Sequence, residues 1–561
     1  MGPHLLWERE IGIKPILRSE EILDGADIIN NLDLYKTLRG HNGCVNTIGW
    51  SKNESLLSSG SDDTLIKLWN IEGDCMSTYE TSHTHNIFGV LFVPGMNDSY
   101  LGSCGGDHQV ILTNLETKEE VQKWSGGGRM KRLASSTHVS HLFWSISEDR
   151  FIRAHDTRSN HSDMKFKIRS TGKSIDVSDL QPHWIAVGSE SENVSIYDTR
   201  NTRRSLMQLG PLDKGIQDSL YVTHVVFSRK SNSLLANYGR GSAYLFDLND
   251  SSQESVFCQH LDELHQLDLN DNGPIDASPS RLSAPIMNIV DEAQSLFSDL
   301  HYVDALSIIT KALQRSDMTG RERAHLLLKR ATIFTARKRE GDSYAAAQDT
   351  LNASLLLPHD TQSFLRFITV LFTMEQVELC REMISLFKTR FPDSVDELGD
   401  MEESLMAISR SNRRPHNVRR NATLTRDYSS RYCGHINNQT DIKEAAFFGP
   451  NEEYVMAGSD SGHIFVYSRD DSSILTLLKG DTSIVNCISP HPRLPIVAAS
   501  GLDEQFLLFS PFNASPMPLE TDSHRMTYSQ AEPILARQST RNLVRELVRM
   551  GDFDEERCQV S

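Results

Sequence analysis

Two short stretches of this chain carry residue types that could bind phosphate or a metal ion. Residues 125–129 read Ser-Gly-Gly-Gly-Arg and could cradle a phosphate, but no Gly-Lys-Ser/Thr ending follows them. Residues 268–273 imitate the start of a calcium loop, but Pro279 stands where a bidentate Glu is required. The two stretches therefore predict neither a nucleotide site nor a calcium site.

A third stretch contains Cys258, His260 and His265, which could supply three zinc ligands. A zinc site needs a further Cys or His at a usable distance, and the polar segment around these residues offers none. The sequence thus predicts no catalytic residue, no metal site and no cofactor. We expect a protein that is not an enzyme and that acts by recognising other molecules.

Charged residues at the ends of two apolar segments favour binding to another protein. The segments end at residues 155–158 (His-Asp-Thr-Arg) and 197–200 (Tyr-Asp-Thr-Arg), one repeat length apart. Arginine has planar donors that can grip acceptors bidentately at an interface that lysine would fit poorly. The charged residues at these two ends are Asp156, Arg158, Asp198 and Arg200. The alternative is that each Asp–Arg pair ties together the loops of its own repeat.

The segments that position these pairs belong to a repeat that runs through the chain. Alternating apolar stretches recur about every 40 residues, which is typical of a β-propeller built from four-stranded blades. Seven copies end at Trp69-Asn70, Thr113-Asn114, His155-Asp156, Tyr197-Asp198, Phe246-Asp247, Tyr467-Ser468 and Phe509-Ser510. Exposed sheet edges are a liability, so the ring should close. We expect residues 34–38 to supply the outer strand of the last blade.

Between the fifth and sixth copies the apolar period changes to that of helices. Residues such as Ala293, Ala305 and Ala312 recur at spacings suited to a helix pair, and two more pairs follow. These pairs resemble tetratricopeptide repeats, of which about three bury a continuous core. The predicted fold is mainly β with an α insert. It is a seven-bladed propeller with a tetratricopeptide-repeat helical module inserted between blades five and six.

The expected organisation has seven parts. They are an N-terminal helical segment (1–33), repeats one to five (34–248), a mobile linker (249–285), the helical module (286–395), an Arg-rich linker (396–430), repeats six and seven (431–510) and a polar tail with an amphipathic helix (511–561). The Arg-rich linker could meet nucleic acid, phosphate or an acidic protein tail, or it could be an import signal or a solvated spacer. The net charge of −18 repels polyanions and disfavours broad nucleic-acid binding.

The composition is that of a large globular protein, since the chain has 561 residues and 38% of them are hydrophobic. No apolar run approaches the roughly 18 residues of a membrane span, and the N-terminus does not read as a signal sequence. The eight cysteines are scattered, which favours reduced thiols over disulfides. We expect the protein in the nucleus and the cytoplasm, with no membrane partner.

The first copy resembles a WD repeat. Gly40-His41 is followed by residues 45–50, 58–63 and 66–70. The resemblance implies that four residues form a buried hydrogen-bonded set, namely His41, Ser59, Asp63 and Trp69. Buried polar groups must be paired, so we interpret this set as a structural network and not as a catalytic triad.

WD repeats that end in aromatic-Asp-x-Arg, above all in two consecutive blades, resemble the substrate receptors of cullin-4 RING ubiquitin ligases. The resemblance implies that Asp156, Arg158, Asp198 and Arg200 bind the ligase adaptor, the large damage-binding propeller protein. It also implies that residues 1–33 anchor to that adaptor, and that a substrate protein of unknown identity is a further partner.

The order of the parts is similar to that of the WD and tetratricopeptide repeats protein 1 family, also called adipose. Five local stretches carry this resemblance, at residues 40–46, 85–88, 431–435, 440–445 and 483–487. The resemblance implies a non-catalytic ligase receptor that restrains fat storage and associates with histones and a histone deacetylase.

Two other functions stay open. A chromatin-associated transcriptional co-repressor scaffold would act independently of the ligase, and its histone binding would survive loss of Arg158 and Arg200. A chaperone adaptor would need a clamp of Lys and Asn for an acidic C-terminus. Val290, Gln294 and Thr332 occupy three positions of such a clamp, which disfavours this function.

Overall fold

The computed structural model describes residues 28–29, 31–159, 164–211, 220–249, 256–266, 282–313, 315, 318–338, 342–374, 376–399, 401, 426–470, 472–511 and 525–527. The chain divides into two compact units. The first comprises residues 1–206, 217–249 and 429–561, and the second comprises residues 207–216 and 250–428. Three predicted features lie outside the described residues: the N-terminal anchor up to residue 27, the arginine pairs of the 396–430 linker and the amphipathic stretch of the tail.

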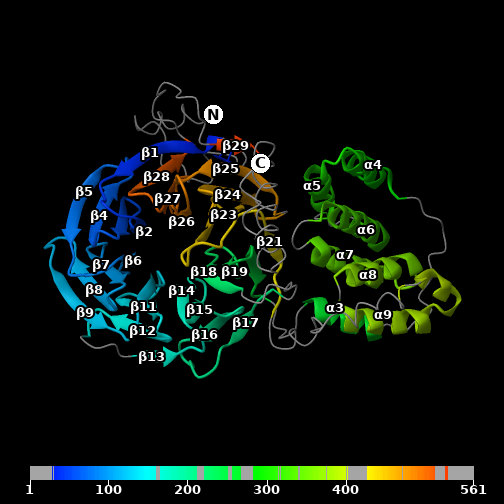
Figure 1. Cartoon of the computed structure of the whole chain (residues 1–561), viewed down its shortest axis with the longest axis horizontal. Coiled ribbons are helices and arrows are strands. Elements are labelled where there is room, and N and C mark those ends of the chain that lie inside the picture. The colour runs from blue at the N-terminus through cyan, green and yellow to red at the C-terminus, as the bar shows by residue number, and fades with distance from the viewer. Residues whose placement is uncertain are drawn as a thin grey trace, which may run out of the picture. The chain divides into compact units, whose positions relative to one another are not determined.

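Antiparallel sheets arranged in a ring make up the first unit (Figure 1). Four sheets follow the order of the chain. Their strands are β2 (Val45–Trp50), β3 (Leu56–Ser61), β4 (Leu65–Asn70) and β5 (Cys75–Glu80); β6 (Ile87–Phe92), β7 (Tyr100–Gly105), β8 (Gln109–Asn114) and β9 (Glu120–Ser125); β10 (Met130–Ala134), β11 (Leu142–Ser147), β12 (Phe151–Asp156) and β13 (Met164–Lys167); and β14 (Gly172–Val177), β15 (Trp184–Ser189), β16 (Val194–Asp198) and β17 (Met207–Leu209).

The remaining three sheets combine distant parts of the chain. The fifth contains β18 (Tyr221–Phe227), β19 (Ser233–Gly239), β20 (Ala243–Asp247) and β21 (Ser430–Tyr432). The sixth contains β22 (Ala445–Phe448), β23 (Tyr454–Gly458), β24 (His463–Ser468), β25 (Ile474–Lys479) and the short β29 (Arg525–Thr527). The last contains β26 (Val485–Pro490), β27 (Val497–Gly501), β28 (Gln505–Ser510) and β1 (Asp33–Arg39).

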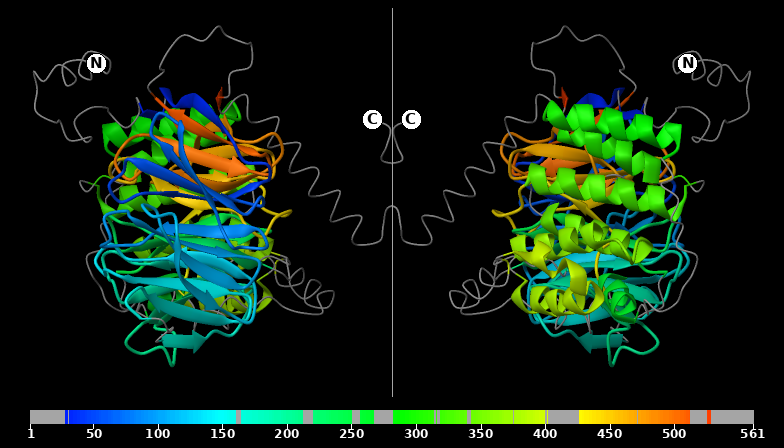
Figure 2. Two further views of the ribbon diagram at one scale, coloured as in Figure 1. Left: turned by 90° about the vertical axis from the view of Figure 1, so that its left-hand side faces the viewer. Right: turned by 90° about the vertical axis from the view of Figure 1, so that its right-hand side faces the viewer.

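The predicted fold class is confirmed, and so is closure of the ring by the N-terminal strand. β1 pairs antiparallel with β28, from Asp33 opposite Ser510 to Arg39 opposite Gln505. The blue N-terminal strand and the orange C-terminal strands lie side by side in Figures 1 and 2. The helical insert leaves the fifth sheet after its third strand, β20, and the chain returns as its fourth strand, β21.

Burial explains why these sequences form blades. The second strand of each of the first four blades is apolar or small at nearly every position, because neighbouring blades cover both of its faces. The outer strands β5, β9 and β13 each bury only one side chain, and in each it is aromatic: Tyr79, Trp124 and Phe166. Phe166 contacts Tyr197 with ring centroids 5.2 Å apart, so β13 packs beside β16 of the next blade.

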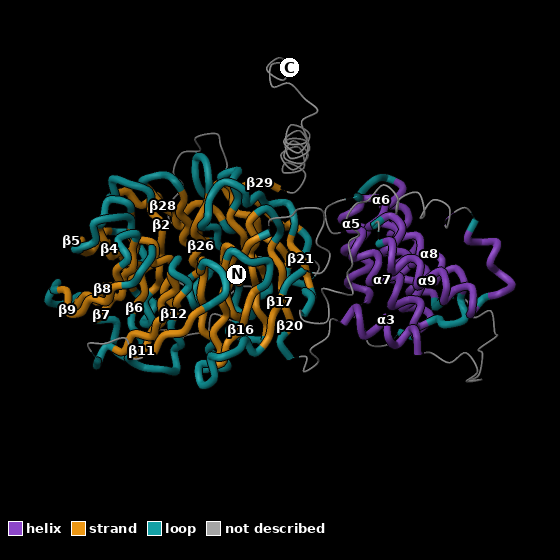
Figure 3. The backbone as a smooth tube through the Cα atoms, turned by 60° about the horizontal axis from the view of Figure 1, so that its bottom comes forward, coloured by secondary structure: helices purple, strands orange, loops and turns teal. Residues whose placement is uncertain are grey.

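Apart from residues 207–216, which include β17, the described part of the second unit consists mainly of helices, shown purple in Figure 3. They are α3 (Val256–Gln266), α4 (Ala284–Ser298), α5 (Tyr302–Leu313), α6 (Gly320–Arg337), α7 (Asp342–Leu356), α8 (Thr361–Thr373), α9 (Val377–Arg390) and the 3-10 helix η2 (Pro392–Leu398). Each helix from α4 to α9 packs on the next one in the chain. A capping box starts α6, in which Thr319 accepts a hydrogen bond from the backbone N–H of Glu322.

One part of the predicted mobile linker has a different structure. Residues 256–266 form helix α3, which packs against α7. Leu261 and Leu264 of this helix are buried, and this apolar contact offsets the polar composition of the surrounding segment. Within the described part of the chain, no helix is both long enough and apolar enough to cross a membrane.

Candidate protein-binding site

The first predicted Asp–Arg pair lies at the end of β12, where the chain turns toward β13, the outer strand of the third blade. Asp156 Oδ1 accepts hydrogen bonds from the backbone N–H of Arg158 and from Arg158 Nε, each at 2.9 Å. Arg158 Nη2 donates to Asp156 Oδ2 at 2.7 Å. This two-point contact holds the guanidinium in one orientation. The Arg158 side chain nevertheless stays 69% exposed, whereas that of Asp156 is 20% exposed.

The second pair repeats this geometry at the end of β16. Asp198 Oδ1 accepts from the backbone N–H and from Nε of Arg200, each at 2.9 Å, and Arg200 Nη2 donates to Asp198 Oδ2 at 2.7 Å. The Arg200 side chain is 65% exposed. Each carboxylate therefore positions its arginine, and each arginine remains accessible to a partner.

The arginines also determine the charge state of these carboxyl groups. Arg158 is the main cause that lowers the pKa of Asp156 to about 2. In the same way, Arg200 lowers the pKa of Asp198 to about 2. Both aspartates are therefore charged near neutral pH, and the two-point contacts persist through the physiological range.

Both arginines lie on one face of the propeller. β12 and β16 are the third strands of consecutive blades, and β13 of the third blade packs beside β16 of the fourth (Figure 1). Equivalent strands of a propeller run in the same direction, so the C-terminal ends of β12 and β16 lie on the same face. We call it the Arg face, defined by Asp156, Arg158, Asp198 and Arg200.

The other five copies of the repeat lack this arginine. Two positions beyond the third strand they carry Glu72, Glu116, Asn249, Asp470 and Phe512. Glu116 of the second blade accepts a hydrogen bond from Ser99 Oγ at 2.8 Å, so its turn presents a carboxylate where the next two turns present guanidinium groups. The positive pair is therefore confined to blades three and four.

Two histidines that the sequence analysis missed support the same turns. The backbone carbonyl of His141 accepts from Thr157 N at 3.0 Å, and that of His183 accepts from Thr199 N at 2.8 Å. The two histidines are 42 residues apart, as are the two arginines, and this spacing is the signal that could have found them. Leu180, in the turn from β14 to β15, lies at the same end of its blade and is 46% exposed.

The structure also brings together the four residues of the WD network. His41 Nδ1 lies 2.8 Å from Asp63 Oδ2, and His41 Nε2 lies 2.8 Å from Ser59 Oγ. Trp69 Nε1 donates to Ser59 Oγ at 2.9 Å. The two contacts of Ser59 are buried inside the first blade, and that of Asp63 is part-buried. Burial lowers the pKa of His41. The Ser59 hydroxyl thus has hydrogen-bond contacts with the Trp69 indole and the His41 imidazole inside the blade.

The Gly-rich segment at 125–129 is explained by the third copy of this network. Gly126 stands four residues before β10, where the first two blades have His41 and His83, and the backbone N–H of Gly127 donates to Asp149 Oδ2 at 2.8 Å. Arg153 then binds the same aspartate and donates to Ser147 Oγ at 2.8 Å. The glycines therefore form the turn between β9 and β10.

The possible metal ligands lie partly within and partly outside the described residues. The calcium-like stretch at 268–273 lies outside the described residues, as does the side chain of Cys258. His265 Nε2 lies 2.9 Å from Glu382 Oε1 of α9. Among the described residues, no group of three or more His, Cys, Asp or Glu side chains is placed to hold a metal ion.

Comparison with known proteins gives matches of two kinds. A family model described as "WD domain, G-beta repeat" matches residues 32–70. Human WD and tetratricopeptide repeats protein 1 is 30% identical over 580 aligned residues, which cover 86% of this chain and 85% of that protein. Protein ALTERED SEED GERMINATION 2 of Arabidopsis thaliana is 23% identical, covering 88% of each chain. Human DDB1- and CUL4-associated factor 6 is 30% identical over 45% of this chain and 33% of its own.

Proposed function

The chain belongs to the family of WD and tetratricopeptide repeats protein 1, and on this basis we propose that it is a non-catalytic substrate receptor of a cullin-4 RING ubiquitin ligase. In this proposal the Arg face docks to the ligase adaptor, and another surface presents a target protein. The chemistry of ubiquitin transfer belongs to the other subunits. The protein therefore contributes recognition and no catalytic group.

One observation carries the proposal. Two arginines, each fixed by a two-point contact to an aspartate and each about two-thirds exposed, lie on one face in consecutive blades. Exposed arginines that are already oriented lose little side-chain entropy when they bind, and Arg is enriched among the residues that dominate interface energies. Leu180 adds exposed apolar surface to the same face.

The name of one relative points to the adaptor. That relative is called a DDB1- and CUL4-associated factor, and it aligns with 45% of this chain. We extend that association to this chain, with Arg158 and Arg200 as the contacts to DDB1. By the same family membership we propose a location in nucleus and cytoplasm, a link to histones and a histone deacetylase, and a role in restraining fat storage.

Affinity capture of the full chain from cells tests the proposal. The wild type is compared with the Arg158→Ala/Arg200→Ala variant, and co-purified adaptor is measured by quantitative mass spectrometry. Each hot-spot arginine contributes about 2 kcal/mol or more, so the double variant should lose about 4 kcal/mol, or roughly 1,000-fold in adaptor affinity. Replacement of both by lysine should also weaken capture, because lysine cannot make the two-point contact with Asp156 or Asp198.

Arg129→Ala is the matched control. Arg129 is 55% exposed and bonded to Glu148 at 2.7 Å, like the tested arginines, but it lies in the turn before β10, at the opposite end of the third blade. This variant should capture the adaptor as the wild type does. If the wild type itself captures no adaptor, the Asp–Arg pairs serve only to stabilise the turns in which they lie. The alternative of a chromatin-associated co-repressor scaffold then replaces the receptor proposal.

A further inference from the structure

The outer edge of the sixth blade differs from the edges of the other sheets. Within the described residues, six sheets have four strands each, whereas the sixth blade has a fifth strand, β29 (Figure 1). β29 pairs antiparallel with the outer strand β25, from Thr527 opposite Thr476 to Arg525 opposite Leu478. We call this side of β25 the blade-six edge. A segment of the tail thus lies along an edge that has no fifth strand in the described parts of the other blades.

The side chains of β25 are unlike those of the other outer strands. In blades one, two, three and six, the first residue of the third strand lies opposite the last residue of the outer strand, so equivalent positions can be compared. Leu477 takes the position of Thr78 in β5, Lys123 in β9 and Lys165 in β13. Those three side chains are exposed, whereas Leu477 is fully buried.

The preceding position shows the same difference. Thr476 is fully buried, and its equivalents in β5, β9 and β13 are only half-buried. Thr476 and Leu477 are two of the three residues that pair with β29. The unusual burial of β25 therefore coincides with the pairing of the tail strand.

An edge of this kind needs a cover. Free edges that carry apolar side chains pair readily with other chains, and charged side chains are a common protection against this. Lys123 and Lys165 provide a charge on β9 and β13, but Leu477 provides none on β25. The tail strand replaces that protection at the blade-six edge.

The cover is short compared with the strand that it covers. β29 has three residues, whereas β25 has six. A three-residue strand forms few ladder hydrogen bonds, and ordering its backbone opposes them. Such a contact opens locally much more easily than the blade itself unfolds. A longer strand that pairs with all of β25 would form more of these bonds.

We propose that the blade-six edge is a strand-addition site for an extended segment of a partner protein, and that β29 is its built-in competitor. A segment of about six residues matches the length of β25 and displaces the tail strand. Its backbone supplies the ladder hydrogen bonds, and an apolar residue opposite Leu477 suits the apolar edge. The site lies in blade six and does not depend on adaptor binding by the Arg face of blades three and four.

A partner segment is favoured over a second copy of this chain. A second copy would offer its own β25, and each β25 is covered by its own β29. Pairing of two copies therefore requires two displacements, whereas pairing with a partner segment requires one. The partner has the lower cost of opening.

Proline substitutions in the tail of the full chain test the site. Alternate residues of a strand direct their N–H groups to the neighbouring strand, so Arg525→Pro/Met526→Pro removes at least one ladder hydrogen bond. Arg525→Gln/Met526→Leu keeps both N–H groups and is the matched control. Thermal unfolding checks that both variants are folded.

Fluorescence anisotropy measures binding of a labelled peptide of residues 522–530, Asp-Ser-His-Arg-Met-Thr-Tyr-Ser-Gln. The proline variant should bind this probe. The wild type and the matched control should bind it at least about tenfold more weakly, because their own β29 competes at a high effective concentration. Leu477→Thr, which introduces the residue of the first blade, should weaken binding to the proline variant about fivefold. Absence of binding to the proline variant, or equal binding by all the chains, would overturn the proposal.

A second probe represents the partner segment and uses the wild-type chain. It is the peptide Thr-Thr-Arg-Met-Thr-Val-Thr, in which β-branched residues extend the strand. It should bind the wild type more tightly than the first probe does, and hydrogen exchange measured by mass spectrometry should become faster at residues 522–530. Binding without this release of the tail would place the probe elsewhere and contradict the proposal.

Sedimentation velocity distinguishes a partner from a second copy. The proline variant should remain a monomer, which supports a partner segment as the occupant. A dimer that the first probe dissociates would show that the open edge pairs with its own copy, and would overturn the assignment to a partner.

Discussion

At the scale of single residues, local partners decide which arginines of the third blade are available for binding. Arg153 and Arg158 are five residues apart, and each binds an aspartate through two points. Arg153 is 10% exposed and completes the buried network where Gly126 replaces a histidine. Arg158 is 69% exposed because its strand has ended. The first arginine is structural, and the second is free to contact a partner.

His155 illustrates how burial controls a titratable group. It lies where the first blade has Trp69, bonded to Ser145 Oγ at 2.8 Å and packed between Phe143 and Trp124. Burial is the main cause that lowers its pKa from 6.5 to about 3, and the charge of Arg153 lowers it further. The folded chain thus keeps this imidazole neutral at a pH where the unfolded chain would protonate it.

This shift predicts a pH dependence of stability. Between pH 6.5 and 3 the unfolded state binds the proton that folded His155 does not. The stability contributed by the neutral imidazole is therefore complete above pH 6.5 and is lost as the pH falls, at up to about 1.4 kcal/mol per pH unit. His155→Gln cannot titrate, so its unfolding free energy should fall less steeply below pH 6.5 than that of the wild type.

Denaturant unfolding from pH 7.5 to pH 4.5, followed by the fluorescence of the neighbouring Trp124, measures the difference. His224 and His435, whose pKa values are also lowered by burial to about 3, still titrate in the variant and leave part of the slope. Parallel curves for the two proteins would show that His155 is protonated inside the fold and would contradict the prediction.

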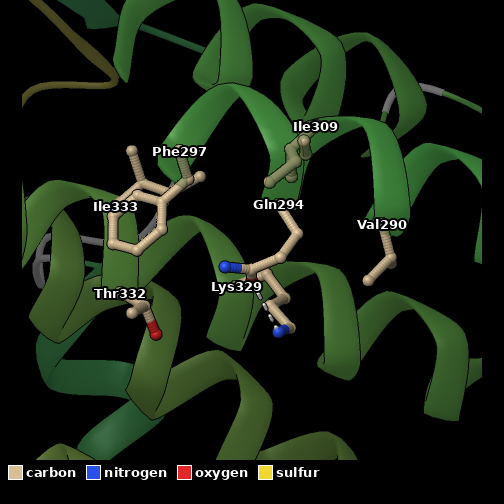
Figure 4. Close-up of a pocket in the computed structure, with 8 residues that line it drawn as sticks. Val290, Gln294, Phe297, Ile309, Lys329, Thr332 and Ile333 are labelled. Atoms are coloured by element: carbon tan, nitrogen blue, oxygen red, sulfur yellow. Dashed lines mark hydrogen bonds between the residues drawn. The ribbon is translucent and has the colours of Figure 1, made fainter. Parts of the chain in front are cut away.

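At the scale of elements, helix α6 combines two kinds of surface. One side binds its neighbours through buried ion pairs, and another carries Lys329, whose Nζ donates to Gln294 of α4 at 3.2 Å (Figure 4). Arg330 donates to Asp349 of α7 at 2.7 and 2.8 Å and to Thr310 of α5 at 3.3 Å, so one guanidinium joins three helices. Asp349 is 3% exposed and depends on this partner.

We predict that Arg330→Ala loosens the helical unit. Removal of the arginine leaves the Asp349 carboxylate buried without its cation, which costs about 3–5 kcal/mol. Hydrogen exchange measured by mass spectrometry should show faster exchange across α6 and α7. Arg323→Ala removes an exposed arginine from the same helix and should change stability by no more than about 0.5 kcal/mol.

A compensating pair completes this test. Arg330→Met with Asp349→Leu replaces both charges by apolar side chains, and it should recover most of the loss, since the main penalty comes from the unpaired charge. If the double variant exchanges as fast as Arg330→Ala, packing of the arginine stem is the important contribution, and the argument from the buried charge is wrong.

Some elements could be predicted from the sequence and others could not, for physical reasons. Helix pairs such as α4 and α5 show apolar residues at helical spacing because one side is buried, and the sequence revealed them. Helix α3 was not predicted because it lies in a segment that is otherwise polar, and Leu261 and Leu264 are the buried side chains among those described in this helix. β21 is only three residues long, too short for alternation to show. The insert separates β21 from its partner β20 by about 180 residues of chain. A local sequence pattern carries no information on a pairing over that separation.

At the scale of the whole propeller, the closed ring was predictable because its copies repeat a pattern that only neighbouring blades can bury. The positions of Asp156 and Asp198 at strand ends followed from the same repeat. The contacts of Lys329 and Arg366 did not follow, because each of these side chains bonds to a residue of another helix that is far away in sequence. Gln294 and Thr332, the neutral partners of these cations, lie on different helices for the same reason.

Closure also makes the ring depend on its N-terminal segment. β1 supplies the outer strand of the last blade, and Leu38 is buried against Trp69 of the first blade and Phe506 of the last. Just before it, Ile28, Ile29 and Leu32 pack on the cores of the last two blades. Burial of a large aliphatic side chain is worth about 1.5–3 kcal/mol, so the four together supply roughly 6–12 kcal/mol, as much as the whole stability of many domains.

We therefore predict that a chain starting at residue 40 unfolds at a temperature at least about 10 °C lower than one starting at residue 28, or aggregates through the exposed edge of β28. Thermal unfolding with light scattering distinguishes the two outcomes. A synthetic peptide of residues 28–39 provides the control, because it should restore the lost stability when added to the shorter chain, by binding the same edge. If the chain from residue 40 melts like the full chain, the first blade and the last hold together without the strand. The closing strand would then be an addition to the ring and not the element that secures it.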